Sequence, residues 1–206
     1  MTVHCLPADL GSPTGADALI ASVTALSQPV SVLINNAGFG LHGPFTDNDP
    51  TRLQEMLQLN LITLTRLTHH FGRAMALRKH GRILQVSSVG AYQATPYYAA
   101  YSATKSYVLL LSEAVQAEMS GTGVTCTTLC PGLTDTEFHD AANHPKTGLM
   151  TITTLSARAV ATIGLKAMFA GRSLVTSGLI NKLNAFLIRL VPRRMATWMT
   201  GLLMKK

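Results

Sequence analysis

A serine, a tyrosine and a lysine in one short stretch have the residue types and spacing for proton transfer. Tyr101 follows Ser88 by thirteen positions, and Lys105 follows Tyr101 by four. Residues four apart on a helix lie on the same face, so a helix here would place the Lys105 ammonium beside the Tyr101 phenol. An ammonium close to a phenol favours the phenolate, and we therefore expect Lys105 to lower the pKa of Tyr101. Such a tyrosine can act as a general acid or base near neutral pH.

The elements around these residues are predicted to form the edge of an α/β sheet. The apolar run Gly81–Ser88 predicts a buried strand, and the segment from Tyr101 to about Met119 predicts a helix. Ser88 would then stand at the carboxyl end of a strand and face the helix, which is where open α/β sheets bind their ligands. The Tyr-Lys pair alone is a weak signal, because a half-buried tyrosine beside a surface lysine has the same spacing.

Strands and helices alternate along the rest of the chain. The sequence predicts further strands at Thr2–Leu6, Val30–Ile34, Val124–Leu129 and Leu174–Thr176, and helices at Asp17–Leu26, Pro50–Lys79 and Ser156–Phe169, with a helical tail after them. This alternation predicts an α/β fold with a doubly wound parallel sheet. Asn60 falls inside the long helix, where asparagine is unfavourable, so its side chain is either exposed or used.

The composition is that of a globular protein with a large core. The 206 residues are 47% hydrophobic and 13% charged, which suits a single domain. Cys126 and Cys130 lack a His or Cys partner at metal spacing, so with Cys5 we expect reduced thiols of a cytoplasmic protein and no metal site. Met1–Leu10 lacks the features of a signal peptide, and no apolar run is long enough to predict a membrane span.

Five signals follow one another in a fixed order along the chain. They are NNAG at Asn35–Gly38, Asn60, Ser88, YSATK at Tyr101–Lys105 and PGLTDT at Pro131–Thr136. With this order and these gaps, nearly the whole chain resembles the ordinary short form of the short-chain dehydrogenase/reductase family. The resemblance implies a Rossmann-like fold and hydride transfer between NAD(P)(H) and a carbonyl or alcohol.

The resemblance also implies the catalytic roles. Tyr101 would protonate a carbonyl during reduction or deprotonate an alcohol during oxidation. Lys105 would lower the pKa of Tyr101 and bind the nicotinamide ribose, so that both residues contact the cofactor. Ser88 would hold and polarise the substrate oxygen. Asn60 would bind a water through its main chain and extend a proton relay from Lys105 to solvent.

A second set of residues is implied as cofactor contacts. Asn35, Ala37 and Gly38 would line the adenosine side, and Asp9, after the first predicted strand, would lie near the adenine. The nicotinamide carboxamide would be held by the segment after the strand Val124–Leu129, through Pro131, Gly132, Thr134 and Thr136.

The sequence departs from the family in one important motif. The glycine-rich turn TGxxxGxG, which binds the cofactor pyrophosphate in the family, is not found. Aligning the motifs makes Thr2–Leu6 the family's third strand, so we expect an N-terminally truncated fold that lacks two strands and two helices, about fifty residues. A misassigned start codon is the favoured explanation, with a truncated gene and a genuine remnant as alternatives. Thr2–Leu6 would lie beside Val30–Ile34, pair with another chain or remain loose.

Coenzyme and substrate are less closely defined. The residue that separates NAD from NADP follows the missing second strand, so the resemblance implies NAD(P), with a lean to NADP. Phe138–Met150 matches the family's substrate lid and carries few charges, which favours an uncharged or apolar substrate. Tyr92, Tyr97 and Tyr98 either line the substrate pocket or pack in the domain. The family commonly forms dimers or tetramers through the helix that carries Tyr101.

The chain is expected to consist of an incomplete catalytic domain, residues 1–178, and a helical tail of the same domain, residues 179–206. From Asn181 to Lys206 there are six basic residues and no acidic one, out of a net charge of +7. Apolar residues recur there at helical spacing, together with Trp198. Such a helix either packs on the domain or a sister subunit, which is the favoured interpretation, or lies on an anionic membrane surface. The rest of the chain carries only +1, and nucleic-acid binding is not indicated.

Three functions remain open from the sequence. The first is a short-chain oxidoreductase that acts on an uncharged carbonyl or alcohol. The second is a non-catalytic remnant that does not bind the cofactor and acts by association, and the third is a peripheral membrane protein that binds through its tail. The combination of Ser88, Tyr101 and Lys105 favours the oxidoreductase, whereas the missing glycine-rich turn favours the remnant.

Overall fold

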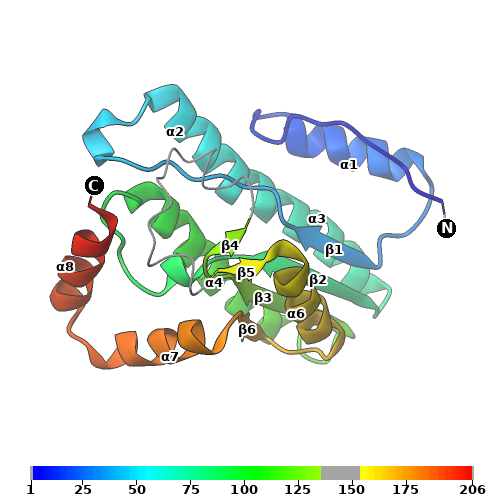
Figure 1. Ribbon diagram of the computed structural model, residues 1–206. Coiled ribbons are helices and arrows are strands. Elements are labelled where there is room, and N and C mark those ends of the chain that lie inside the picture. The colour runs from blue at the N-terminus through cyan, green and yellow to red at the C-terminus, as the bar shows by residue number, and fades with distance from the viewer. Residues whose placement is uncertain (1, 136–153, 206) are drawn as a thin grey trace.

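A parallel β-sheet is the centre of the molecule. The computed structural model describes residues 2–135 and 154–205. Four parallel strands lie in the order β1-β2-β3-β6 (Figure 1). They are β1 (Val32–Asn35), β2 (Gly81–Val86), β3 (Val124–Cys130) and β6 (Leu174–Thr176). A separate parallel pair, β4 (Thr134–Asp135) with β5 (Leu155–Ser156), lies beyond the end of β3. The predicted Rossmann-like α/β fold is confirmed.

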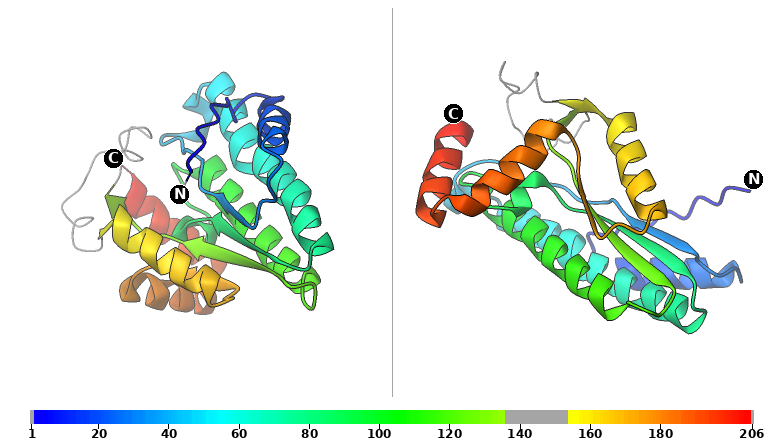
Figure 2. Two further views of the ribbon diagram at one scale, coloured as in Figure 1. Left: turned by 90° about the vertical axis from the view of Figure 1, so that its right-hand side faces the viewer. Right: turned by 90° about the horizontal axis from the view of Figure 1, so that it is seen from below.

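Helices cover both faces of the sheet, as Figure 2 shows. They are α1 (Gly15–Ala25), α2 (Pro50–Leu57), α3 (Leu64–Leu77), α4 (Ala99–Glu118) and α6 (Ala157–Phe169), with short 3₁₀ turns η1 (Phe45–Asp47) and η3 (Val89–Ala91). Side chains alternate across a strand, so Ile83 of β2 joins a core with α1 and α3, whereas its neighbour Leu84 joins a second core with α6. The two cores hold α3 and α6 on opposite faces.

The long helix predicted from Pro50 is present but contains an irregular turn. Asp49 caps its start, because its carboxylate accepts a hydrogen bond from the Thr51 amide at 3.0 Å and Pro50 follows at the first helical position. Between α2 and α3 the chain forms a π-helix, η2 (Gln58–Thr63), which includes Asn60. Such turns are rare and are frequent at functional sites. The sequence did not predict it.

The prediction of a strand at Thr2–Leu6 is wrong. Residues 2–9 form no regular structure, Val3 is exposed, and the first regular element is α1. An isolated strand has no partner for its backbone groups, and in the described part of the chain no strand lies beside this segment. Of the three arrangements considered for Thr2–Leu6, a place beside Val30–Ile34 is wrong, and within the single chain the segment is loose. Pairing with another chain stays a prediction. The strand predicted to end at Ser88 ends at Val86.

The tail is helical and lies at the sheet edge formed by β6. It consists of α7 (Leu179–Leu187), a 3₁₀ turn η5 (Ile188–Leu190) and, after Pro192, α8 (Arg193–Met204). In Figure 1 α7 and α8 run along the left and lower sides of the molecule, whereas the N-terminus and α1 lie at the right. Among the described helices, none is both long and apolar enough to cross a membrane.

Candidate active site

Ser88 is fixed at the carboxyl end of β2. Its hydroxyl accepts a hydrogen bond from the Gly90 amide at 3.1 Å, so that Ser88 caps the turn η3. Two backbone hydrogen bonds tie the same segment to the end of β3, from the Ser87 amide to the Leu129 carbonyl at 2.8 Å and from the Val89 amide to the Pro131 carbonyl at 2.9 Å. The segments of Ser88 and of Pro131 are therefore held against each other.

Tyr101 and Lys105 lie in the first turns of α4 and meet Ser88. The Ser88 hydroxyl hydrogen-bonds the Tyr101 phenol. The Lys105 ammonium lies over the Tyr101 ring, 5.7 Å from its centroid, and donates to the Val86 carbonyl at 2.9 Å. Although it is a lysine, Lys105 is only 6% exposed. The structure thus brings together the three residues on which the sequence argument rests.

The electrostatics of this group differ from the expectation. Burial raises the pKa of Tyr101 to about 12, although the hydrogen bond from Ser88 lowers it. Burial also lowers the pKa of Lys105 to about 8. The prediction that Lys105 lowers the Tyr101 pKa below its ordinary value is wrong for this structure, because the loss of water around the phenol outweighs the favourable contacts of the phenolate.

Asn60 connects three segments of the site. Its amide nitrogen donates to the Phe39 carbonyl at 2.9 Å and to the Thr104 hydroxyl at 3.1 Å, and its amide oxygen accepts from the Phe39 amide at 3.3 Å. The side chain is 1% exposed. The sequence left open whether the Asn60 side chain is exposed or used. The structure shows that it is used, because its hydrogen bonds tie the loop after β1 to α4 beside Lys105.

Replacing Asn60 with alanine should destabilise the protein by about 2–4 kcal/mol. The change leaves both backbone groups of Phe39 without the amide that now pairs them, and an unsatisfied buried group costs about 1–3 kcal/mol. Urea denaturation followed by circular dichroism measures the effect. The matched control is Asn184→Ala, since Asn184 is exposed on α7; equal losses in the two variants would contradict the role given to Asn60.

In the NNAG segment, the Asn35 side chain points into the protein and Gly38 is closely packed. The Asn35 amide donates to the Thr68 hydroxyl and to Gln85, each at 3.0 Å, in a buried polar network between β1, β2 and α3. At Gly38 a Cβ atom would come within 2.9 Å of the Asn60 amide oxygen and 3.5 Å of the Lys105 ammonium nitrogen. Gly38 is thus packed against Asn60 and Lys105, whereas Ala37 is exposed.

Asp9 lies on an exposed loop, where its carboxylate accepts from the Gly11 amide at 3.0 Å. With Phe39 and residues of α2 it lines a cavity of about 620 Å³. The loop is held to the π-helix by a hydrogen bond from the Thr63 hydroxyl to the Leu10 carbonyl at 2.9 Å. Asp9 therefore shares an open depression with the end of the NNAG segment, on the side where the adenosine contacts are expected.

The segment after β3 contacts the tail. The Gly132 amide donates to the Ser177 hydroxyl at 3.3 Å, and the Thr134 hydroxyl donates to the Gly132 carbonyl at 3.0 Å. A Cβ atom on Gly132 would overlap the Asn181 side chain, at 2.1 Å. Pro131, Gly132 and Thr134 are thus gathered at the carboxyl end of β3, whereas Thr136 and the predicted lid Phe138–Met150 lie outside the described residues.

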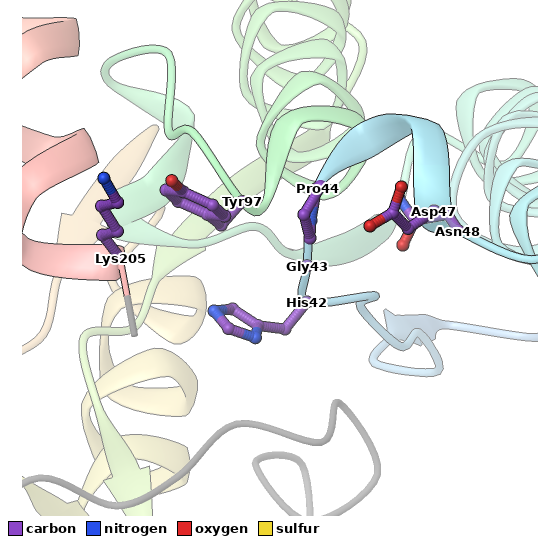
Figure 3. A pocket seen from close by; sticks show the side chains of 7 residues that line it. All are labelled: His42, Gly43, Pro44, Asp47, Asn48, Tyr97 and Lys205. Atoms are coloured by element: carbon purple, nitrogen blue, oxygen red, sulfur yellow. The ribbon is translucent and has the colours of Figure 1, made fainter.

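A pocket of about 470 Å³ opens near the start of α4 (Figure 3). Ser88, Tyr101 and Lys105 do not line it. Its walls come from the loop after β1, from Tyr97 two residues before α4 and from the end of the tail, through His42, Gly43, Pro44, Asp47, Asn48, Tyr97 and Lys205. The His42 ring lies 5.0 Å from that of Tyr98, which lies 5.8 Å from that of Tyr101. Tyr97 therefore lines a pocket, whereas Tyr98 is buried between the pocket and Tyr101.

Comparisons with known proteins agree with this geometry. The profile of the short chain dehydrogenase family matches residues 1–147. The chain belongs to this family. It is 33% identical over 125 residues to the acetoacetyl-CoA reductase of Paracoccus denitrificans, covering 59% of this chain and 52% of that protein. It is 30% identical over 127 residues to the ketoacyl reductase HetN of Nostoc sp., covering 62% and 44%.

A solved short-chain dehydrogenase from Sphingobium yanoikuyae, in complex with NADPH, superposes with a TM-score of 0.77 at 22% identity, covering 93% of this chain and 77% of that one. At this identity the likeness concerns the fold. The chain spans about half the length of the curated relatives it matches.

The nicotinamide end of the family's cofactor fits the residues of this short-chain dehydrogenase. Lys105 is buried and has three N–H donors, and among the described residues it makes one hydrogen bond, to Val86. The remaining donors suit the hydroxyls of a ribose. For the pyrophosphate the sequence offers no glycine-rich turn, so the fit concerns one half of the cofactor.

Several residues of the site were missed by sequence reasoning. Thr104, Gln85 and Thr68 act as hydrogen-bond partners of Asn60 and Asn35 across long sequence separations, and no local pattern marks such pairs. Cys130 is hydrogen-bonded to Tyr92 and Ser87, and burial raises the pKa of its thiol. The position of Cys130 at the end of a predicted strand was the one signal in the sequence that could have marked it as a site residue.

Proposed function

We propose that this short-chain dehydrogenase transfers a hydride between NAD(P)(H) and an uncharged carbonyl or the corresponding alcohol. The observation that carries the proposal is the meeting of Ser88, Tyr101 and Lys105 at the carboxyl end of β2. A remnant without catalysis has no need of this arrangement, because burying the Lys105 ammonium costs stability.

The residues of the chain would then divide the work. The bound cofactor supplies the hydride. Ser88 donates a hydrogen bond toward the substrate oxygen, where negative charge develops during reduction. Tyr101 delivers the proton to the same oxygen, and Lys105 stabilises the phenolate left behind and binds the ribose.

Tyr101 rests in the form that carbonyl reduction uses. Burial raises its pKa to about 12, so the phenol is protonated at neutral pH. A protonated phenol can act as the general acid of carbonyl reduction, whereas alcohol oxidation needs the phenolate as a general base. We propose carbonyl reduction as the first reaction to test, with NAD(P)H as the hydride donor and a lean to NADPH.

Asn60 would help to supply protons to the site and would not take part in the hydride or proton transfer to the substrate. Its side chain is engaged with Phe39 and Thr104, so a contribution to a proton relay would come from its main chain, in the irregular turn η2. A water held there, close to Lys105, would connect the ammonium with solvent.

The substrate class follows from the pocket and from the relatives. The pocket at His42 and Tyr97 mixes polar and apolar walls and lies one aromatic ring away from Tyr101. Two relatives are named as a ketoacyl reductase and an acetoacetyl-CoA reductase. We propose an uncharged 3-oxoacyl compound as the first substrate to test.

A dimer through α4, whose outer face exposes Leu110, is the proposed assembly.

Cofactor titration tests the proposal directly. NADPH and NADH fluorescence would be followed in the 206-residue chain and in the same chain extended by two strands and two helices, with a glycine-rich turn after the first strand. We expect tight binding by the extended chain, NADPH over NADH, and binding weaker by orders of magnitude without the extension, because the pyrophosphate contacts are then lost. An extended chain that binds neither nucleotide, or that binds but reduces no carbonyl, would overturn the proposal.

A further inference from the structure

The two tail helices present their apolar sides to solvent. Every large apolar residue of one stripe is exposed, namely Leu179, Ile180, Leu183, Phe186, Leu187 and Leu190 in the segment of α7 and η5, and Met195, Trp198, Met199, Leu202 and Leu203 in α8. We call these eleven residues the tail surface. Contiguous exposed apolar patches are rare on soluble monomers, and large ones mark interaction sites.

The orientation of both helices is fixed by their inner sides, which are small or polar. In α8 the buried residues are Ala196 and Thr200, and the Thr200 hydroxyl donates to the Ala94 carbonyl at 3.0 Å. At Gly201 an added Cβ would lie 3.2 Å from Pro96. In α7 the Asn181 side chain packs against Gly132, where an added Cβ would come within 2.1 Å of it. The helices are thus held with their apolar stripes pointing away from the domain.

This arrangement corrects one interpretation of the tail. Packing of the apolar stripe on the domain was one of the favoured possibilities, and the structure shows the stripe exposed instead. Two occupants remain, a second copy of the chain and a membrane surface.

Exposed basic side chains lie on the same segments as the tail surface. Lys182, Arg189, Arg193, Arg194 and Lys205 are all exposed. The sequence from residue 179 to 206 has no Asp or Glu. A partner of matching chemistry is therefore apolar where it meets the stripe and negatively charged at its border.

We propose that the tail surface binds the surface of a lipid bilayer that contains anionic headgroups. Amphipathic helices with basic polar faces and exposed Leu, Phe and Trp lie in the plane of such a surface, with the apolar side in the acyl boundary and the cations among the headgroups. The two helices lie at the surface without crossing it. Trp198 is 64% exposed on α8, where an indole suits the interface between headgroups and acyl chains.

A second copy is the weaker occupant on electrostatic grounds. In a two-fold interface the same patch meets itself, so five cations of one tail would approach five of the other with no acidic residue of either tail between them. Like charges brought together in this way oppose association. The anionic bilayer meets the same cations with favourable charge.

Tryptophan fluorescence gives a direct test, because Trp198 is the only tryptophan of the chain. The full chain would be titrated with vesicles of phosphatidylcholine, with and without phosphatidylglycerol. We expect a blue shift of the Trp198 emission and co-sedimentation with the anionic vesicles, little of either with phosphatidylcholine alone, and weakening as salt rises.

Matched variants separate the apolar and the charge contributions. Leu190→Asp should abolish the shift. Leu77→Asp alters a leucine at the end of α3 that is at least as exposed (78% against 69% for Leu190) and should leave the shift unchanged. Replacing Arg193 and Arg194 together with serine should weaken anionic-vesicle binding by about 30-fold. The control replaces the exposed Arg158 and Arg172 in the same way.

Three results would overturn the proposal. One is the absence of a shift with anionic vesicles. Another is equal binding by Leu190→Asp and Leu77→Asp. The third is a stable dimer in light scattering that Leu190→Asp dissociates and that vesicles leave intact. None of these measurements depends on turnover, so the proposal can fail while the proposed enzymatic function stands.

Discussion

Replacing Tyr101 with phenylalanine is expected to lower the rate of carbonyl reduction by about 10²–10⁴-fold in a chain that includes the glycine-rich segment, since this is the usual contribution of general acid catalysis. The phenyl ring fills the same space, and Ser88 and Lys105 remain in place to hold substrate and ribose. Cofactor affinity should therefore change little. Steady-state kinetics together with NADPH fluorescence titration measure both quantities.

The control for this variant is Tyr107→Phe. Tyr107 lies on the same helix, and its hydroxyl is 2.9 Å from that of Thr65 at the surface. Tyr107→Phe removes a tyrosine hydroxyl from α4 and leaves Ser88, Tyr101 and Lys105 unchanged. Retention of full activity by Tyr101→Phe, or an equal loss of activity in both variants, would refute the role assigned to Tyr101.

Replacing Lys105 with methionine should abolish turnover and at the same time stabilise the fold. Burial lowers the pKa of Lys105 from 10.5 to about 8, and such a shift corresponds to about 3 kcal/mol of destabilisation of the charged form. Loss of the hydrogen bond to Val86 offsets about 1 kcal/mol. We expect a net gain of about 1–3 kcal/mol at pH 7, measured by urea denaturation.

The gain should depend on pH in a defined direction. The folded protein holds the Lys105 proton less tightly than the unfolded chain, so the penalty is fully present below pH 8 and disappears as pH rises toward 10.5. The stability advantage of Lys105→Met should thus shrink between these values. The control Lys166→Met removes an exposed lysine of α6, so it should bring no comparable gain in stability at pH 7. A destabilised Lys105→Met at pH 7 would contradict the desolvation argument.

The sequence predicted the elements that carry local periodicity. Strands β2, β3 and β6 and helices α4 and α6 lie within a few residues of their predicted bounds, because their apolar residues repeat with the period of the element. The meeting of Ser88, Tyr101 and Lys105 was also predictable, since it follows from one strand end and one helix face.

Features that depend on distant contacts were not predictable. Thr2–Leu6 has the composition of a strand, but strand formation requires a hydrogen-bonding neighbour that no local pattern reports. The pKa of Tyr101 depends on how much water the fold excludes from the phenol, and the spacing to Lys105 gives no measure of it. The exposure of the tail stripe likewise depends on which side of α8 meets Ala94 and Pro96.

The outer strand β1 has a consequence for how this protein assembles. In the described chain β1 pairs only with β2, and its side chains Val32 and Ile34 are exposed. An open edge of this kind accepts an added strand through backbone hydrogen bonds. A strand that docks at this edge, from the same chain or from another, would extend the sheet beyond β1.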